Sequence, residues 1–242
     1  MSTPDNQSFL NAFGLRRGDV VSIVGAGGKT SLMFRLAREA RNREMKVLVT
    51  TSTKILVPNS VQYDALDLTG KLFSDQTIAA PGVYVGGLPD NLPGKMQGVR
   101  EDFLARQRHL FDLVLIEADG AACKPLKGWR NDEPVVDDST TATIGVLDIQ
   151  TIGTIVNETS VHRLGIFSQL TGAEPGDIIS LGHLLRIICH DDGLFSRSLG
   201  REILFINKVE SEEQQKNADL LRSQLDNLHI VAGSVTRGTI HG

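Results

Sequence analysis

The sequence predicts an α/β fold in which a mainly parallel sheet lies between two layers of helices. Three observations support this prediction. Short, almost fully apolar runs such as VVSIV at residues 20–24 have the length and composition of buried strands. Segments with apolar residues at helical spacing lie between these runs, and such alternation is typical of parallel sheets covered on both faces. Glycines and polar residues follow several of the strands directly, at the positions where ligands bind in such sheets.

The first half of the chain alternates in this way. In order, we expect a short helix and turn (11–18), a buried strand (20–24), an amphipathic helix (29–43), a second strand (46–50), a mixed segment (58–80) and a short strand at a possible sheet edge (82–86). Glycine and proline punctuate residues 86–98, which predicts a flexible loop. A helix (99–110) then leads into a strand (112–117) that ends in carboxylates.

The second half continues the pattern. It predicts strands at residues 143–147, 203–206 and 229–232, the last being the final strand, and a helix at residues 177–190. Ser211 and Gln214 have the spacing of a capping box at the start of another helix. No repeat or low-complexity segment interrupts the sequence, so residues 1–242 are predicted to form a single domain.

The composition argues against several function classes. The formal net charge of −4 gives no reason to expect a nucleic-acid partner. Arginines 35, 38, 41 and 43 are expected on the solvated face of the first long helix. No apolar run reaches membrane-spanning length, and the N-terminus lacks the pattern of a secretory signal. With only Cys123 and Cys189, no disulfide framework is expected. We therefore expect a cytoplasmic protein without nucleic-acid or membrane partners.

The sequence GAGGKTS at residues 25–31 has the chemistry of a phosphate-binding loop between a strand and a helix. The usual glycine five residues before the Gly-Lys pair is absent, because Ile23 occupies that position. The remaining glycines still permit positive φ and let several N–H groups approach one anion. The predicted nucleotide-binding residues here are Gly25, Ala26, Gly27, Gly28, Lys29, Thr30 and Ser31.

Within this loop, Lys29 is expected at the β- and γ-phosphates and Thr30 at Mg²⁺. The spacing Gly-x-x-Gly-Lys-Thr also matches the shorter loop of amide-bond ligases of the peptidoglycan type. The loop makes the predicted fold a three-layer, P-loop NTPase-like domain. The alternative is a plain strand-to-helix turn that happens to contain Lys-Thr.

Two carboxylates follow the strand at residues 112–117. Glu117 and Asp119 are two residues apart, so strand alternation places them on the same side. With Thr30 they form the predicted metal site, one carboxylate near Mg²⁺ and the other orienting a nucleophile. Lys124 and Lys127 are expected to neutralise charge on a transferred phosphoryl group, and the predicted catalytic set is Lys29, Glu117, Asp119 and Lys124. The alternative is a solvated group of charges at a strand end.

The sequence NKVE at residues 207–210 is similar to the Asn-Lys-x-Asp motif with which GTPases read guanine. Asn207 would tie loops together, the Lys208 stem would lie along the base, and Glu210 replaces the aspartate. The predicted ligand is therefore a purine nucleoside triphosphate, ATP or GTP, with Mg²⁺. Alternatively, Glu210 only favours the first turn of the next helix.

Several other residues are expected to have mainly structural roles. Cys189 is expected in the core, Trp129 as a loop anchor, and His162 and Arg163 at the surface. Thr51 and Thr53 follow another strand and would serve either the γ-phosphate or a local turn. Cys123 is expected near the nucleotide as a small packing residue, and the alternative is a reactive or selenium-handling thiol.

Together, five segments resemble the YqeC family, whose members are accessory proteins of selenium-dependent molybdenum hydroxylases. The segments are GAGGKTSLMFRLA, LVTTSTK, FDLVLIEADGAACKPLK followed by Glu133 and Pro134, VHR at residues 161–163, and ILFINKVE. The likeness runs from about Gly14 to the C-terminus. It implies a nucleotide-dependent role in maturing a molybdenum hydroxylase or its cofactor, with that enzyme or its maturation factors as partners.

The sequence thus predicts a nucleotide-binding accessory protein that acts as a Mg²⁺-dependent NTPase, with residues 86–98 as a moving part. Two alternatives remain open at this stage. One is a phosphate-activating transferase or ligase related to the short-loop amide ligases. The other is a non-catalytic module that delivers a cofactor.

Overall fold

A central sheet organises the computed structural model, which describes residues 8–70, 73, 78, 80–99 and 101–241, without the side chains of 101–103. Across these residues, nine strands form the sheet, and every pairing is parallel except that of the last two strands. In spatial order they are β14 (Thr239–His241), β13 (His229–Ser234), β12 (Arg201–Asn207), β10 (Ala142–Asp148), β1 (Val20–Gly25), β8 (Leu113–Glu117), β2 (Lys46–Thr51), β5 (Gly82–Gly86) and β4 (Ala65–Asp67).

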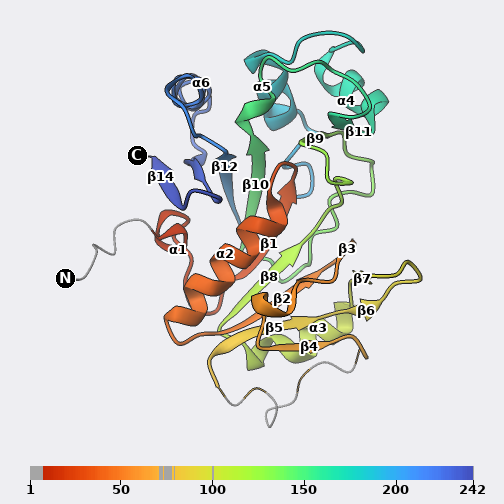
Figure 1. Ribbon diagram of the computed structural model, residues 1–242, viewed down its shortest axis with the longest axis vertical. Coiled ribbons are helices and arrows are strands. Elements are labelled where there is room, and N and C mark those ends of the chain that lie inside the picture. Colours follow the sequence, from red (N-terminus) through yellow and green to blue (C-terminus); the bar gives the residue numbers. More distant parts are fainter. Residues whose placement is uncertain (1–7, 71–72, 74–77, 79, 100, 242) are drawn as a thin grey trace, which may run out of the picture.

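Helices cover both faces of this sheet, so the fold is the predicted three-layer α/β arrangement (Figure 1). On one face lie α1 (Phe9–Ala12) and α2 (Lys29–Asn42), and on the other lie α3 (Glu101–Gln107), α4 (Leu164–Thr171), α5 (Leu181–Cys189) and α6 (Glu212–Arg222). The short elements are η1 (Ser60–Gln62), η2 (Arg108–Leu110), η3 (Ile149–Thr151), β3 (Lys54–Leu56), β6 (Leu88–Pro89), β7 (Lys95–Gln97), β9 (Leu126–Lys127) and β11 (Val161–His162).

Strand alternation explains how the two faces share the core. In β1, Val21 and Ile23 are fully buried against the α2 side, whereas Val24 is buried on the side of α4 to α6. On α2, Leu32 and Leu36 belong to the same core cluster as Val21 and Ile23, as the helical spacing of the apolar residues predicts. Each such side chain contributes roughly 1.5–3 kcal/mol when it is fully buried. This packing holds the start of α2 directly after the end of β1.

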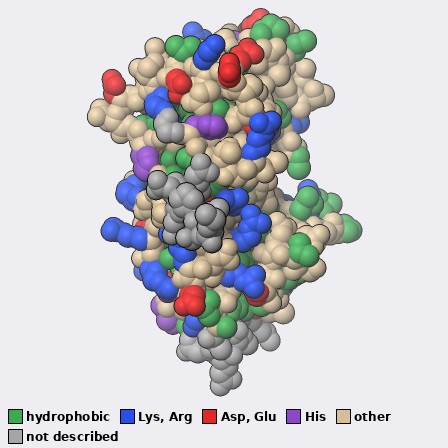
Figure 2. All heavy atoms as spheres, turned by 60° about the vertical axis from the view of Figure 1, so that its left-hand side comes forward, with side chains coloured by type: hydrophobic (Ala, Val, Ile, Leu, Met, Phe, Trp, Pro, Cys, Tyr) green, Lys and Arg blue, Asp and Glu red, His purple; other side chains and the backbone are tan. Residues whose placement is uncertain are grey.

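The α1 side of the molecule carries a surface rich in positive charge. Lys and Arg side chains gather across the middle of this face in the space-filling view (Figure 2). Arg35 pairs with Glu39 at 2.6 Å and lies over the Phe9 ring, while Arg41 pairs with Asp64 at 2.9 Å. These arginines of α2 therefore occupy the predicted solvated face, held by local partners.

Residues 86–98 differ from their prediction as a flexible loop. Two of their segments, β6 and β7, pair antiparallel with each other, and β7 pairs with β3 to complete a three-stranded sheet. The Gly98 N–H donates to the Thr53 carbonyl at 3.1 Å, which ties the end of this segment to the residues after β2. Glycine and proline lie within and between these short strands. They are tolerated there because a strand of two or three residues forms few ladder hydrogen bonds, so one missing donor does not break the pairing.

Four smaller predictions were also wrong. The strand β5 is internal, since it lies between β2 and β4, and the final strand is β14 rather than β13. Helix α5 begins at Leu181, because the Asp177 carbonyl accepts from Val156 N–H and the Ile179 N–H donates to Thr154, which keeps residues 177–179 extended. Cys189 ends that helix and is exposed.

The topology sets the position of the site. Strands β12, β10, β1, β8 and β2 are parallel, so their carboxyl ends share one edge of the sheet. The glycine loop leaves the central strand β1 at this edge. In the described part of the chain, no helix combines the length and apolar composition that a membrane crossing needs. Residues 1–7, on which the expectation about a secretory signal partly depends, lie outside the described residues.

Candidate functional site

The glycine loop lies tightly against the ends of two neighbouring strands. Gly25, Gly27 and Gly28 have φ values of +99°, +84° and +131°. A Cβ on Gly27 would lie 2.3 Å from the Cβ of Asp148, and one on Gly28 would lie 2.4 Å from Nδ2 of Asn207. Both the backbone conformation and the close approach therefore require glycine at these positions.

The loop presents a run of backbone amides that meet no acceptor in the described part of the chain. The Gly25 N–H donates to Asp119 and the Ala26 N–H donates to the Val146 carbonyl. Among the described residues, none accepts a hydrogen bond from the N–H groups of residues 27–31. The last of these amides belong to the first turn of α2, where the helix dipole also favours negative charge. This is the arrangement that binds phosphate groups at helix N-termini.

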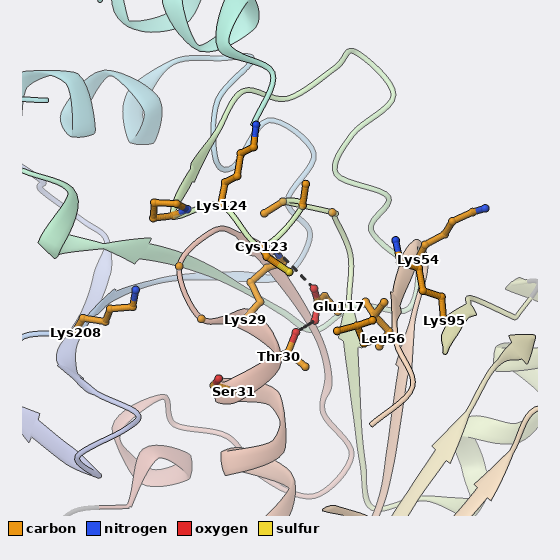
Figure 3. A pocket seen from close by; sticks show the side chains of 17 residues that line it. Lys29, Thr30, Ser31, Lys54, Leu56, Lys95, Glu117, Cys123, Lys124 and Lys208 are labelled. Carbon is orange, nitrogen blue, oxygen red and sulfur yellow. Dashed lines mark hydrogen bonds and ion pairs between the residues drawn. The ribbon is translucent and has the colours of Figure 1, made fainter. Parts of the chain in front are cut away.

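These amides border a pocket of about 650 Å³. Its walls are formed by residues 27–31 of the loop, residues 120–125 after β8, and the strands β3 and β7 of the small sheet. Five lysines line it, and Glu117 is the acidic residue among the described lining residues (Figure 3). The lysines are Lys29, Lys54, Lys95, Lys124 and Lys208. The pocket is therefore suited to a polyanion.

Thr30 and Glu117 face each other at the floor of this pocket. The Thr30 hydroxyl donates to Glu117 Oε2 at 2.6 Å. Burial raises the pKa of Glu117 above its ordinary value, although Lys29 and the Thr30 hydroxyl partly oppose this effect. One hydroxyl and one carboxylate are oxygen ligands of the kind that Mg²⁺ uses when phosphates and water complete its coordination. Among the described residues, no group of three or more His, Cys, Asp or Glu side chains forms a self-sufficient metal site.

Lys29 is held beneath the loop. Its side chain is 4% exposed, and Nζ donates to the Gly25 carbonyl at 2.7 Å. The same ammonium lies 3.2 Å from Asp119 Oδ1 and 3.8 Å from Glu117 Oε1. The two carboxylates thus do converge on one point, as strand alternation predicts, and that point is the lysine.

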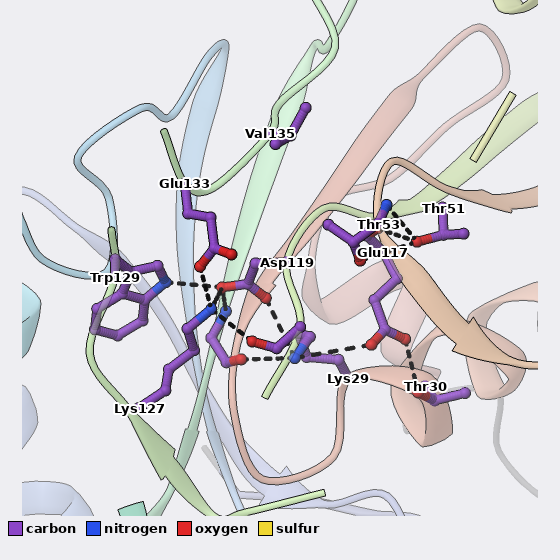
Figure 4. A network of polar contacts seen from close by, with 12 residues as sticks. Lys29, Thr30, Thr51, Thr53, Glu117, Asp119, Lys127, Trp129, Glu133 and Val135 are labelled. Carbon is purple, nitrogen blue, oxygen red and sulfur yellow. Dashed lines mark hydrogen bonds and ion pairs between the residues drawn. The ribbon is translucent and has the colours of Figure 1, made fainter. Parts of the chain in front are cut away.

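Asp119 is fully buried behind the loop rather than in the pocket (Figure 4). Its Oδ2 accepts from Gly25 N–H at 3.0 Å, from Lys127 Nζ at 3.0 Å and from Trp129 Nε1 at 2.7 Å. Burial would raise the pKa of Asp119, but Lys29, Lys127 and these hydrogen bonds outweigh it and lower the pKa. In this arrangement Asp119 positions the loop and is not placed to ligate a metal in the pocket.

Behind Asp119 lies an ionic network that sequence reasoning did not assign. Lys127, which is fully buried, also donates to Glu133 Oε2 at 3.2 Å, and Arg163 donates to Glu133 Oε1 at 2.6 Å. Lys127 therefore serves Asp119 instead of reaching the pocket, and Arg163 is tied to the network rather than free at the surface. A lysine eight residues after a buried aspartate, within a β-strand, was the signal available in the sequence.

The three predicted nucleotide-binding residues of the NKVE segment lie in different places. Asn207 Nδ2 donates to the Gly27 carbonyl at 2.8 Å, so it ties β12 to the loop as expected from the GTPase motif. Lys208 lines the pocket and pairs with Asp148. Glu210 accepts from the Ser234 hydroxyl at 2.7 Å and borders a separate pocket of about 420 Å³. The structure therefore does not bring Glu210 into the pocket with the loop.

The remaining predicted residues are placed as follows. Lys124 lines the pocket, and its Nζ donates to the Val161 carbonyl at 3.3 Å. Cys123 also lines the pocket and is exposed, so its prediction as a packing residue was wrong. Thr51 donates to the Glu117 carbonyl at 2.8 Å and accepts from the Thr53 N–H at 3.0 Å. These contacts match the local turn that was the alternative for the two threonines.

Comparison with known proteins identifies related sequences. The family model described as "YqeC protein" matches residues 21–165. The chain is also 32% identical over 197 residues to a protein of Escherichia coli (strain K12) described as "Uncharacterized protein YqeC", an alignment that covers 80% of this chain and 77% of that relative. No solved structure gives a significant match.

Proposed function

The chain belongs to the YqeC protein family, and from that premise and the geometry of the pocket we propose that it binds and hydrolyses a Mg²⁺–nucleoside triphosphate. The observation that carries the proposal is the run of amides at residues 27–31, which have no acceptor among the described residues and border a pocket lined by five lysines. A triphosphate matches both the donors and the charge.

The β- and γ-phosphates would lie against the loop, with Lys29 as their counter-ion. Lys29 already lies under the loop, where its side chain is almost fully buried and pairs with Glu117 and Asp119. A buried ammonium interacts strongly with a phosphate because little water competes. Binding therefore exchanges part of the carboxylate contact of Lys29 for a phosphate contact.

Thr30 and Glu117 are the residues that would hold the metal ion. Their oxygens are adjacent, and Glu117 is the carboxylate that lines the pocket. When bound, Mg²⁺ supplies positive charge to the phosphate oxygens, as in other nucleotide-hydrolysing sites. Lys124, on the wall formed by residues 120–125, would stabilise negative charge on the transferred phosphoryl group.

Asp119 acts in this scheme through the loop. It fixes the Gly25 amide and contacts Lys29, and it is itself held by Lys127 and Trp129. We therefore assign Asp119 as a positioning residue and leave Thr30 and Glu117 as the metal ligands of the chain.

Binding of ATP, GTP and CTP, measured by calorimetry with and without Mg²⁺, tests the proposal and identifies the base. Lys29→Ala is expected to abolish binding, whereas Lys216→Ala, an exposed lysine on α6, should bind as the parent does. Equal affinity of Lys29→Ala and the parent would refute the phosphate site. Release of phosphate without an added acceptor separates hydrolysis from binding alone.

For the biological role, we propose that nucleotide turnover assists maturation of a selenium-dependent molybdenum hydroxylase, as the family resemblance implies. The test compares hydroxylase activity in cells that carry the parent gene, Lys29→Ala or Lys216→Ala. Loss of activity with Lys29→Ala alone is the expected result. Full activity with Lys29→Ala would separate the nucleotide site from this role.

A further inference from the structure

Two lysines in the pocket are not accounted for by the phosphate loop. Lys54 lies on β3 and Lys95 lies on β7, so both belong to the small antiparallel sheet. They line the same pocket as the loop, on the side away from Lys208, with Lys29, Thr30 and Glu117 between (Figure 3). The pocket therefore has two positively charged ends with the phosphate loop in the middle.

The sheet order explains this separation. Lys208 directly follows β12, which lies two strands from β1 on one side of the sheet. Lys54 follows shortly after β2, which lies two strands from β1 on the other side. Neighbouring strands are about 4.8 Å apart, so each end lies roughly 10 Å from the loop. A nucleotide whose phosphates lie on the loop extends its nucleoside toward one end only. The other end is left for a different molecule.

Charge and apolar surface indicate what this second end can hold. Lys54 Nζ lies 2.6 Å from Asp90, whose side chain is buried, so that lysine is compensated. The Lys95 backbone bonds to Leu92 and Asp90, whereas its side-chain ammonium forms no ion pair or hydrogen bond with any described residue and acts on Asp90 only at longer range. Leu56, which also lines the pocket, is 61% exposed. An ammonium without a direct ion-pair partner among the described residues, beside an exposed leucine, suits a ligand with an anionic group and an apolar part.

We propose that Lys54, Lys95 and Leu56 form the binding site of a second substrate, a small molecule with a phosphate or carboxylate group attached to an apolar or planar body. The proposal rests on the proposed function, because it places this molecule next to the terminal phosphate of the bound nucleotide. It makes the small sheet of β3, β7 and β6 the substrate-binding element of the protein.

The test titrates phenyl phosphate, and separately benzoate, into protein saturated with Mg²⁺ and a non-hydrolysable ATP or GTP analogue. The two probes share the apolar ring and distinguish a phosphate from a carboxylate ligand. Lys95→Gln is expected to weaken binding of the better probe by about tenfold or more. Lys54→Gln should weaken it at least as much, because it leaves the Asp90 carboxylate unpaired beside the anion. Lys216→Gln on α6 is the matched control.

The nucleotide titration is carried out on every variant and separates the possible failures. Unchanged affinity for the nucleotide analogue, with weakened probe binding in both variants, supports the second site. Binding of the analogue by the parent without binding of either probe overturns the second site and leaves the nucleotide site intact. Loss of analogue affinity in Lys95→Gln and Lys54→Gln, in chains that circular dichroism shows to be folded, assigns these lysines to the nucleotide and also overturns the inference. A parent that binds no nucleotide overturns both proposals.

Discussion

Replacement of Asp119 by asparagine tests whether a buried carboxylate holds the phosphate loop in place. The two side chains have the same shape, so the change removes charge without creating a cavity. Asp119 accepts three hydrogen bonds through Oδ2, from Gly25, Lys127 and Trp129, and faces Lys29 through Oδ1. Every neighbour is a donor, so the new amide N–H₂ group must point at one of them.

The size of the effect follows from these partners. Removal of one member of a buried ion pair typically costs about 3–5 kcal/mol. Neither lysine is left alone in the variant, because Lys127 keeps Glu133 at 3.2 Å and Lys29 keeps the Gly25 carbonyl at 2.7 Å. We therefore expect the lower end of the range, a loss of about 3 kcal/mol in the free energy of unfolding.

Urea unfolding at neutral pH, followed by far-ultraviolet circular dichroism, measures this loss. Asp132→Asn is the control, since Asp132 is 71% exposed on its side chain and pairs with Arg130 at the surface. Its loss should stay within about 1 kcal/mol. A loss of under about 1 kcal/mol for Asp119→Asn as well would show that the buried charge does not hold the loop, and the positioning role would be refuted.

Three further predictions concern the loop, the thiols and acid stability. Gly27→Ala should abolish nucleotide binding, because its Cβ would lie 2.3 Å from Asp148, whereas Gly94→Ala, with open space around it, should bind normally in the same calorimetric titration. Bound nucleotide should slow the reaction of Cys123 with a thiol reagent while Cys189 reacts as before, since only the first lines the pocket; equal rates for Cys123 with and without nucleotide would contradict this. Arg163 and Lys127 overcome the effect of burial and lower the pKa of Glu133, so its ionic contribution is present above pH 4.5 and is lost as the pH falls through the lowered pKa. Urea unfolding should accordingly show a stability gap between parent and Glu133→Gln that closes on acidification, and a gap independent of pH would argue against the ion pair.

Local sequence patterns were sufficient for the loop and for the main strands and helices around it. Residues 20–43 contain a buried strand, three glycines with positive φ and an amphipathic helix, and each of these depends on neighbours in the sequence. The same patterns failed for residues 86–98. The strand β7 forms because it pairs with β3, about forty positions earlier in the sequence. A strand of three residues has too few alternating side chains for a sequence pattern to predict such a pairing.

Strand alternation correctly brought Glu117 and Asp119 together but did not separate their roles. Glu117 lines the pocket, whereas Asp119 is enclosed by Lys127 and Trp129 from the following segment. The solvent exposure of a carboxylate depends on the side chains that pack over it. Those side chains come from other segments of the chain, so a local sequence pattern does not predict them.

By itself, the sequence determined that this protein has a parallel α/β sheet with a glycine loop after its first strand, since periodicity and backbone freedom are local properties. Tertiary structure alone decided which carboxylate reaches the pocket, where Glu210 lies, and that Lys54 and Lys95 face the loop from a second sheet. Those facts depend on the order in which strands assemble. Strand pairing joins residues distant in the chain, and its free energy comes from contacts that exist only after folding.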